Sequence, residues 1–322
     1  MLEIKDLSVR YGKQAPTIEH FNLNMKKGEI ISVVGESGSG KTTVIRAVLG
    51  ALAGGGKVTQ GDILFNGKSL LTNTKDEWRQ LRGTRISMIF QDCGGTLNPI
   101  RKIGSQFVEY ICTHSKVSKA DAWKKGVSML EKMRLPEAEN IMNSYPHQLS
   151  GGMRQRVMIA MALAQNPSLI IADEPTTALD VTIQAQIMEL MKEMKEKTGV
   201  SIMLITHDMG VVAEMADKIM VMYAGMVIEY ATAREIFKDP KHPYTKGLLA
   251  SIPRKDKDID RLYTIEGTVP SLTSMPKGCR FCDRCTRAME KCRNEQPPMY
   301  QFGERSVRCF LYEDKGGVSD ER

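Results

Sequence analysis

Residues 35–42, with the sequence GESGSGKT, have the composition and spacing of a phosphate-binding loop. They follow the apolar run 30–34, and their glycines let successive backbone N–H groups curl around an anion at the start of a helix. In this pattern Lys41 reaches the β- and γ-phosphates, and the hydroxyl of Thr42 ligates Mg²⁺. The segment therefore predicts a nucleoside triphosphate as the ligand.

Two carboxylates follow a second apolar run. Residues 169–172 (LIIA) predict a buried strand, and Asp173 and Glu174 come directly after it. Nucleotide hydrolases use this arrangement to hold Mg²⁺ beside a phosphate-binding loop. We expect Asp173 to hold the water shell of the metal and Glu174 to polarise the attacking water, a contribution of roughly 10²–10⁴-fold. Many strands end in surface acids, so the prediction depends on the presence of the loop upstream.

Residues 149–156 (LSGGMRQR) open a helical pattern that runs to about residue 165. Ser150 is a good N-cap, and Gly151 and Gly152 leave backbone N–H groups uncovered at the helix start. The pattern is consistent with a second anion site. It is also consistent with an ordinary capped helix.

These residues require an α/β layered domain to position them. Apolar runs typical of strands lie at 30–34, 86–90, 169–172, 202–205 and 218–223, and they alternate with helical patterns. Residues 180–199 predict an amphipathic helix that ends at Gly199. Residues 100–146 show helical patterns and no convincing strand, which predicts a helical subdomain over about 100–165 within the nucleotide domain.

Length and charge limit the possible functions. The chain has 322 residues, enough for about two domains, and a formal charge of +7. No apolar run approaches the roughly 18–20 residues of a membrane span, and the first residues lack the apolar region of a secretory signal. We therefore expect a cytoplasmic or peripheral protein. Basic residues alternate with acidic ones, as in 192–197, so a solvated helix face explains the charge better than a nucleic-acid partner does.

The sequence of residues 149–156 resembles the signature of ABC ATPases, and further residues match the family in the same order over roughly 1–240. Tyr11 is similar to the aromatic residue that stacks on adenine, Gln91 to the Q-loop glutamine, and His207 to the switch histidine. Residues 178–180 (ALD) are similar to the D-loop. The resemblance implies a P-loop NTPase fold with a RecA-like core and ATP hydrolysis.

Site assignments follow from this resemblance. It implies Glu174, His207 and Gln91 as catalytic residues, and Thr42, Gln91 and Asp173 as Mg²⁺ ligands. The nucleotide contacts that it implies are Tyr11, Gly35, Ser37, Gly38, Gly40, Lys41, Thr42, Thr43, Asp173, Ser150, Gly151, Gly152 and Asp180. In ABC ATPases the signature of one subunit covers the nucleotide held by the other. A second ATPase subunit, identical or different, is therefore implied.

Four further segments look like those of the oligopeptide and dipeptide importer ATPases. Nickel-importer ATPases share much of the same sequence in these segments. The segments are LNP at 97–99, YPHQ at 145–148, HPY at 242–244 and EGTVP at 266–270. This resemblance implies two membrane permease subunits, an extracytoplasmic solute-binding protein and a place on the cytoplasmic face of the membrane. Residues 92–106 are then expected to border the permease, although Cys93 stands where the family has proline.

The alternatives are an ATPase for nickel or another small solute and a soluble ABC ATPase that acts on nucleic acid or ribosomes. The positive charge of the chain favours the soluble ABC ATPase. The presence of one ATPase unit rather than a tandem pair, and the lack of a long heptad segment, speak against it. We therefore expect no nucleic-acid partner.

The composition changes after residue 252, which predicts a nucleotide-binding domain at 1–252 and a small module rich in proline and cysteine at 253–322. Five of the seven cysteines lie in this module, in a compartment where structural disulfides are disfavoured. Their spacing leaves open zinc on four thiolates, an iron–sulfur cluster, or no metal. A bound metal would help a short module to fold. A role as a redox or iron sensor is a further possibility.

The cysteines that recur in peptide-importer ATPases, some of which resemble [4Fe–4S] proteins, correspond to four in this chain. They are Cys279, Cys285, Cys292 and Cys309. The resemblance therefore implies these four as ligands, with Cys282 as a substitute, and it favours a [4Fe–4S] cluster over Zn²⁺. Cys93 and Cys112 stand apart and are expected to be unligated.

Overall fold

The computed structural model describes residues 1–177, 179–252, 263–315 and 317–318. The chain divides into two compact units. Unit 1 contains residues 1–26, 30–72 and the described residues from 206 onward, and unit 2 contains residues 27–29 and 73–205. In the part of the chain that the structure describes, every helix is too short or too polar to cross a lipid bilayer.

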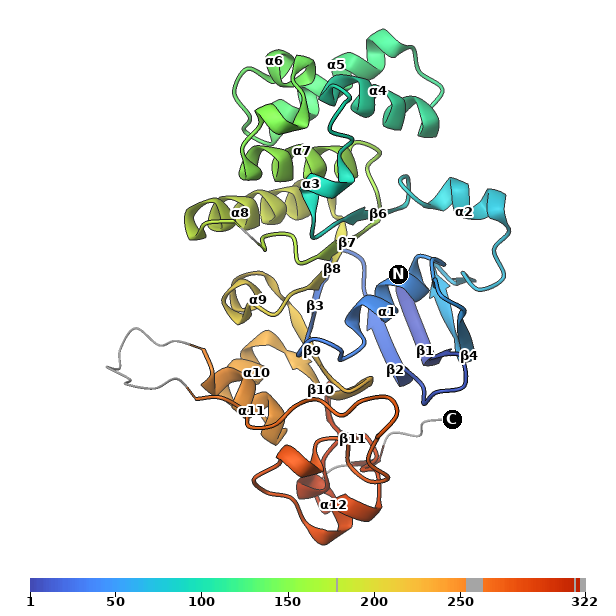
Figure 1. Ribbon diagram of the computed structural model, residues 1–322, viewed down its shortest axis with the longest axis vertical. Coiled ribbons are helices and arrows are strands. Elements are labelled where there is room, and N and C mark those ends of the chain that lie inside the picture. The colour runs from blue at the N-terminus through green and yellow to red at the C-terminus, as the bar shows by residue number, and fades with distance from the viewer. Residues whose placement is uncertain (178, 253–262, 316, 319–322) are drawn as a thin grey trace. The chain divides into compact units, whose positions relative to one another are not determined.

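Unit 1 begins with an antiparallel sheet in the order β2-β1-β4-β5, drawn in shades of blue in Figure 1. Its strands are β1 (Leu2–Tyr11), β2 (Ile18–Met25), β4 (Gly56–Phe65) and β5 (Lys68–Ser69). In β2, buried and more exposed positions alternate, as expected for a sheet with one face in the core. The sheet places the aromatic ring of Tyr11 at the last position of β1.

A second sheet of unit 1 contains the strand that leads into the phosphate-binding loop. In the order β13-β11-β12-β10-β9-β3, it comprises β13 (Gly317–Val318), β11 (Tyr300–Phe302), β12 (Arg305–Val307), β10 (Met226–Thr232), β9 (Lys218–Tyr223) and β3 (Ile30–Val34). β3 pairs with β9 in parallel, and β10 pairs with β9 and β12 antiparallel. All of β3 is buried, which explains why its sequence is apolar except at Ser32. The C-terminal strands therefore extend the sheet that contains β3.

The helices of unit 1 are short. They are α1 (Lys41–Val48), α9 (Met209–Met215), α10 (Ala233–Lys238), α11 (Pro243–Ala250) and α12 (Glu290–Asn294), with the 3₁₀ turns η2 (Cys282–Arg284) and η3 (Phe310–Tyr312). A buried apolar cluster joins α9, α10 and α11 to the sheet, and it contains Val34 and Tyr223 from the strands with Tyr244 of α11 and Phe281, next to η2. The cysteine-rich segment is thus packed on the core of unit 1.

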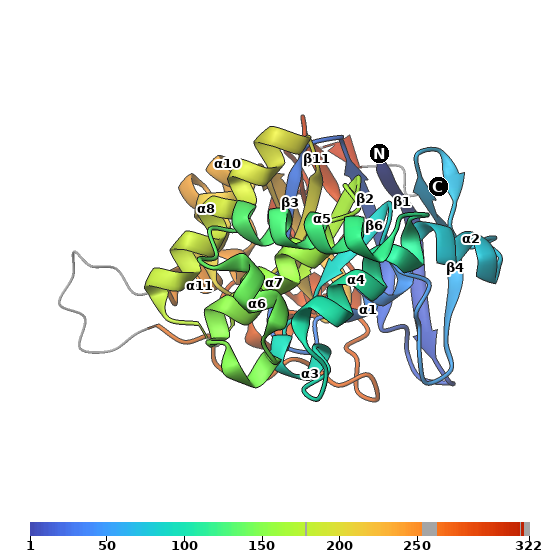
Figure 2. The same ribbon diagram turned by 90° about the horizontal axis from the view of Figure 1, so that it is seen from above.

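Unit 2 has three parallel strands in the order β8-β7-β6: β8 (Ser201–Ile205), β7 (Leu169–Asp173) and β6 (Ile86–Ile89). Its helices are α2 (Lys75–Leu81), α3 (Cys93–Thr96), α4 (Ile103–His114), α5 (Lys119–Lys132), α6 (Ala138–Asn143), α7 (Gly151–Leu163) and α8 (Val181–Thr198), with the 3₁₀ turn η1 (Pro146–Gln148). Figure 2 shows α4 to α7, in green, gathered as a helical group. The predicted strands, the helix at 180–199 and the helical character of 100–165 are confirmed, and the described residues 100–146 contain no strand.

Candidate nucleotide site

The phosphate-binding loop has a backbone that only glycine adopts easily. Gly35, Gly38 and Gly40 have φ angles of 152°, 79° and 103°, where a Cβ atom is strained. A Cβ at Gly35 would also lie 2.2 Å from the carbonyl oxygen of Met222 at the end of β9. The backbone of the loop therefore curves tightly and lies close to the neighbouring strand β9. The loop leads directly into α1.

Lys41 is the first residue of α1, and its side chain folds back over the loop. Its Nζ donates to the carbonyl oxygens of Gly35 at 2.6 Å and Glu36 at 2.9 Å. Thr42 is exposed, whereas Thr43 is buried, so only the first hydroxyl is open to a ligand. Ser37 and Gly38 at the tip of the loop are also exposed. This arrangement presents an ammonium group and a hydroxyl at a helix N-terminus, as triphosphate binding requires.

Two neighbours of the loop were not apparent from the sequence. The backbone N–H of Glu36 donates to the hydroxyl of Tyr244 at 3.0 Å, and that of Gly225 donates to the carbonyl oxygen of Ser39 at 3.0 Å. Burial raises the pKa of Tyr244, so its hydroxyl stays protonated at neutral pH. No local spacing rule predicts these contacts, because the partners are about 190 to 210 residues away along the chain.

Tyr11 and His207 also belong to unit 1. Tyr11 is half-buried at the end of β1, and its ring covers Gly56, where a Cβ atom would lie 2.5 Å from a ring carbon. His207 is exposed in the loop before α9. The following residue, Asp208, caps α9 by accepting from the N–H groups of Gly210 and Val211. The ring of Tyr11 is therefore partly accessible and that of His207 is accessible.

Unit 2 brings together Glu174 and Gln91, two of the three predicted catalytic residues. Glu174 follows β7, and its Oε2 accepts hydrogen bonds from Nε2 of Gln91 and Oγ1 of Thr177, both at 2.9 Å. Its backbone has a φ angle of 45°, a strained value for a residue other than glycine that is often associated with functional sites. Asp173 is the last residue of β7 and is half-buried. The two carboxylates lie at the end of the strand, as predicted.

The signature residues form the start of α7 in unit 2. Ser150 caps the helix by accepting from the N–H of Met153 at 3.2 Å. A Cβ at Gly152 would lie 2.7 Å from Ile183, so this glycine permits close packing on the start of α8. Asp180 caps α8 by accepting from the N–H of Ile183 at 2.9 Å. Ala178 of the predicted D-loop lies outside the described residues.

Five cysteines line one small cavity in unit 1. They are Cys279, Cys282, Cys285, Cys292 and Cys309, and none of them forms a disulfide. Burial raises the pKa of Cys279 to about 12 and that of Cys309 to about 11, so these thiols are protonated without a cation to pair with. Within the described ranges, no group of three or more His, Cys, Asp and Glu side chains could hold a metal ion.

Two family models match the chain. Residues 18–177 match the family described as ABC transporter, and residues 228–292 match the family described as oligopeptide/dipeptide transporter, C-terminal region. Among solved structures, the dimeric ATP-binding cassette MJ0796 bound to ADP and Pi is 30% identical, with a TM-score of 0.64, over 73% of this chain and 99% of that one. The cbiO1 protein of Clostridium perfringens is 29% identical, with a TM-score of 0.65, over 74% and 90%.

Curated relatives match along almost their whole length. The oligopeptide transport ATP-binding protein AppD of Bacillus subtilis is 47% identical over 98% of both chains. OppD of Salmonella typhimurium is 47% identical over 96% of this chain and 93% of that one, and the dipeptide transport protein DppD of Bacillus subtilis is 46% identical over 98% and 96%. With this similarity and a phosphate-binding loop of the expected geometry, the chain is an ATPase and belongs to the family of oligopeptide and dipeptide ABC transport ATP-binding proteins.

Proposed function

We propose that this chain binds and hydrolyses ATP to drive the import of dipeptides or oligopeptides through a membrane permease. The observation that carries the proposal is the order of two matched regions: an ABC transporter region at 18–177, followed by an oligopeptide/dipeptide transporter region at 228–292. The names of the relatives, which are transport proteins for oligopeptides and dipeptides, support the same solute class.

At the reaction centre, Glu174 takes a proton from the attacking water. The water oxygen bonds to the γ-phosphorus, and the bond from this phosphorus to the oxygen that bridges it to the β-phosphate breaks, so that ADP leaves and phosphate forms. The hydrogen bonds of Glu174 with Gln91 and Thr177 support this role, because they orient the carboxylate. Lys41 neutralises charge on the β- and γ-phosphates. In this proposal His207 contacts the γ-phosphate.

The remaining contacts surround the nucleotide and its metal. Tyr11 stacks on adenine, and Mg²⁺ is held by Thr42, Gln91 and Asp173. The loop contributes Gly35, Ser37, Gly38, Gly40 and Thr43. In a two-subunit sandwich, the exposed Ser150, with Gly151, Gly152 and Asp180, faces the nucleotide of the partner ATPase subunit.

The assembly that we propose has a second ATPase subunit, two permease subunits and an extracytoplasmic solute-binding protein. The chain then lies on the cytoplasmic face of the membrane as a peripheral subunit. The similar structure of MJ0796 is itself a dimer, which supports pairing of ATPase subunits. To test the solute class, the reconstituted complex is offered labelled peptides or Ni²⁺, and the uptake of each is measured. Uptake of Ni²⁺ alone would refute the peptide assignment.

Replacing the proposed general base tests the reaction. The variant Glu174→Gln is expected to retain binding of Mg·ATP while ATP turnover falls about 10²-fold or more, because the amide cannot accept the proton. Turnover is measured by phosphate release and binding by calorimetry. The control is Glu189→Gln, an exposed carboxylate on α8 that pairs with Arg134 and is expected to leave turnover unchanged. Wild-type turnover in the Glu174 variant would remove this residue from the mechanism.

We further propose that the residues 253–322 form a metal-binding module with a [4Fe–4S] cluster on Cys279, Cys285, Cys292 and Cys309, and Cys282 as the substitute ligand. The donor set fits, since all five thiols line one cavity and such a cluster takes four cysteines. Each thiolate of a cluster binds a different iron, whereas around Zn²⁺ four sulfurs lie about 2.3 Å from one ion. Iron and sulfide would therefore accompany a cluster, whereas zinc without sulfide would accompany the alternative site.

Metal analysis of anaerobically purified protein tests the cluster. We expect about four iron and four sulfide per chain. We also expect loss of both in Cys292→Ser, but no loss in the control Cys112→Ser, which lies outside the cavity. Stoichiometric zinc without sulfide would favour the alternative. Absence of both metals would refute the module's metal-binding role.

A further inference from the structure

An arginine of the cysteine-rich segment contacts the phosphate-binding loop directly. Arg284 is the last residue of η2 and stands between Cys282 and Cys285. Its Nη1 donates to both carboxylate oxygens of Glu36, the second residue of the loop, at 3.0 and 3.1 Å. Only 7% of the Arg284 side chain is exposed. This ion pair joins residues 248 positions apart in the sequence.

The guanidinium group of Arg284 is held in place by further acceptors. Its Nε donates to the carbonyl oxygen of Glu266 at 2.8 Å, and its Nη2 donates to that of Ile265 at 3.2 Å. Nη1 also donates to the hydroxyl of Tyr223 at 3.2 Å. Because these partners fix the planar group, its contact with Glu36 has a defined direction.

Glu36 is connected in turn to the group that binds phosphate. Its carbonyl oxygen accepts from Nζ of Lys41 at 2.9 Å and from the N–H of Ser39 at 3.2 Å. Its own N–H donates to Tyr244, whose ring packs on Tyr223 with centroids 4.8 Å apart. A displacement of Glu36 therefore moves the acceptor that orients the lysine.

A second arginine of the same segment supports the other side of the loop. Arg280 is 8% exposed and donates to the carbonyl oxygen of Ala224 and to the carboxylate of Glu19. The next residue, Gly225, donates its N–H to the carbonyl oxygen of Ser39. The segment 279–285 thus contacts the loop and the turn beside it.

Electrostatics adds a reason for the pairing of Arg284 with Glu36. A carboxylate in the loop is a like charge close to the triphosphate, and it opposes binding unless a cation neutralises it. We propose that Arg284 is a positioning residue for the phosphate-binding loop, which holds and neutralises Glu36 and thereby strengthens binding of Mg·ATP. The inference rests on the ATP site proposed above, but it does not depend on what the cysteines bind.

A double-mutant cycle on the full chain tests this role. In Arg284→Gln we expect the Kd for Mg·ATP, measured by calorimetry, and the KM of the assembled transporter to rise about tenfold with kcat nearly unchanged, since uniform binding is lost. Glu36→Gln alone should change the Kd and the KM for Mg·ATP less than Arg284→Gln does. The double variant should recover at least half of the lost affinity on a logarithmic scale, and Arg284→Lys should retain most of it.

Controls separate this role from general support of the fold. Arg293→Gln removes an exposed arginine of α12 and should leave Kd and KM unchanged. Thermal unfolding and iron content are measured on each variant. An unchanged Kd in Arg284→Gln overturns the inference, as does a loss of affinity that Glu36→Gln does not relieve. If the wild type itself fails to bind Mg·ATP, the proposed function fails and not the role of Arg284 alone.

Discussion

Gly35 shows how a single residue sets the geometry of the phosphate site. Its φ angle of 152° and the 2.2 Å approach of a Cβ to the carbonyl oxygen of Met222 leave no room for a side chain. The role of Gly35 follows from the sequence, because the spacing of glycines before Lys41 is local. The ion pair of Arg284 with Glu36 could not be predicted, because it depends on tertiary packing between distant segments.

Replacement of this glycine should impair nucleotide binding. In Gly35→Ala the backbone of β9 cannot yield easily, so the loop must move, and we expect affinity for Mg·ATP to fall at least about tenfold in calorimetry. The control is Gly54→Ala, which has a positive φ angle of 64° but nothing within 4 Å of the added atom. It should cost about 1 kcal/mol of stability and leave affinity unchanged. Equal affinity in the two variants would contradict this account.

At the scale of elements, continuous apolar runs predicted the strands that are buried on both faces, and helical patterns predicted α7 and α8. The strands of the antiparallel sheet were missed for a physical reason. β1 is interrupted by register shifts between Ile4 and Leu7, where Asp6 has a φ angle of 45°, so its sequence lacks strict alternation. The pairing of β12 with β10 could not be predicted, because β12 has only 3 residues and is too short to show a periodicity.

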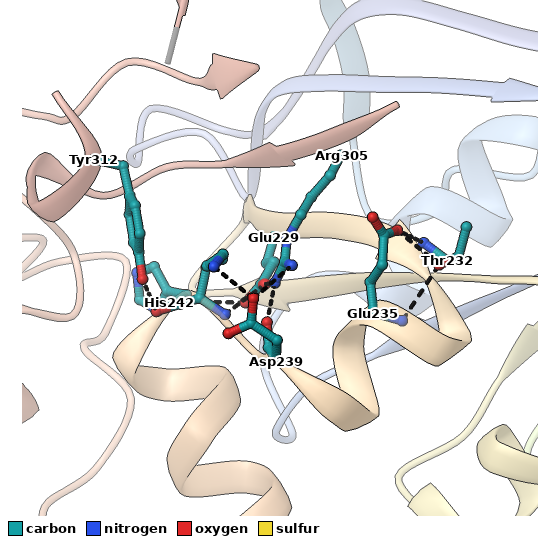
Figure 3. A network of polar contacts seen from close by, with 8 residues as sticks. Glu229, Thr232, Glu235, Asp239, His242, Arg305 and Tyr312 are labelled. Atoms are coloured by element: carbon teal, nitrogen blue, oxygen red, sulfur yellow. Dashed lines mark hydrogen bonds and ion pairs between the residues drawn. The ribbon is translucent and has the colours of Figure 1, made fainter. Parts of the chain in front are cut away.

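The start of α10 has a capping box whose stability should depend on pH. Oγ1 of Thr232 accepts from the N–H of Glu235, and Oε2 of Glu235 accepts from the N–H of Thr232 at 3.0 Å and its hydroxyl at 2.6 Å (Figure 3). These hydrogen bonds from Thr232 lower the pKa of Glu235 below its usual 4.5. The carboxylate therefore adds stability above about pH 4.5, and this contribution is lost as the pH falls through the folded pKa.

Removal of the cap should reveal this dependence. Thr232→Ala is expected to lower the free energy of unfolding by about 1 kcal/mol at pH 7. The difference from wild type should shrink as the pH falls from 4.5 through the lowered pKa of folded Glu235, because below that pKa the carboxyl group is protonated in both proteins. Urea unfolding over a pH series measures it, with Thr113→Ala on the exposed face of α4 as the control. A difference that is independent of pH would show that the carboxylate contributes little.

At the scale of the molecule, a buried ion pair ties the C-terminal strands to the nucleotide-binding sheet in unit 1. Glu229 of β10 is fully buried, and Arg305 of β12 donates to its Oε1 at 2.6 Å (Figure 3). The same carboxylate accepts from the backbone N–H groups of Lys241 and His242, both at 2.8 Å. Loss of Arg305 leaves the carboxylate of Glu229 buried without its ion-pair partner, which is costly.

Truncation of this arginine should destabilise unit 1. Arg305→Met is expected to lower the free energy of unfolding by about 3–5 kcal/mol. Adding Glu229→Gln should cost less than the same change made in the wild type, since no unpaired charge remains to be buried. Thermal and urea unfolding measure both effects, with the exposed Arg234→Met of α10 as the control. Additive losses would mean that the two side chains act independently.

The parallel pairing of β3 with β9 has a consequence for synthesis of the chain on the ribosome. Ile30 donates its N–H to the carboxylate of Asp217, 187 positions later. At about 5–20 residues per second, roughly 10–40 s pass before the second partner is translated. During that interval β3, which is apolar apart from Ser32 and wholly buried in the folded protein, lacks β9 as a partner, and its exposed side chains favour aggregation of the nascent chain.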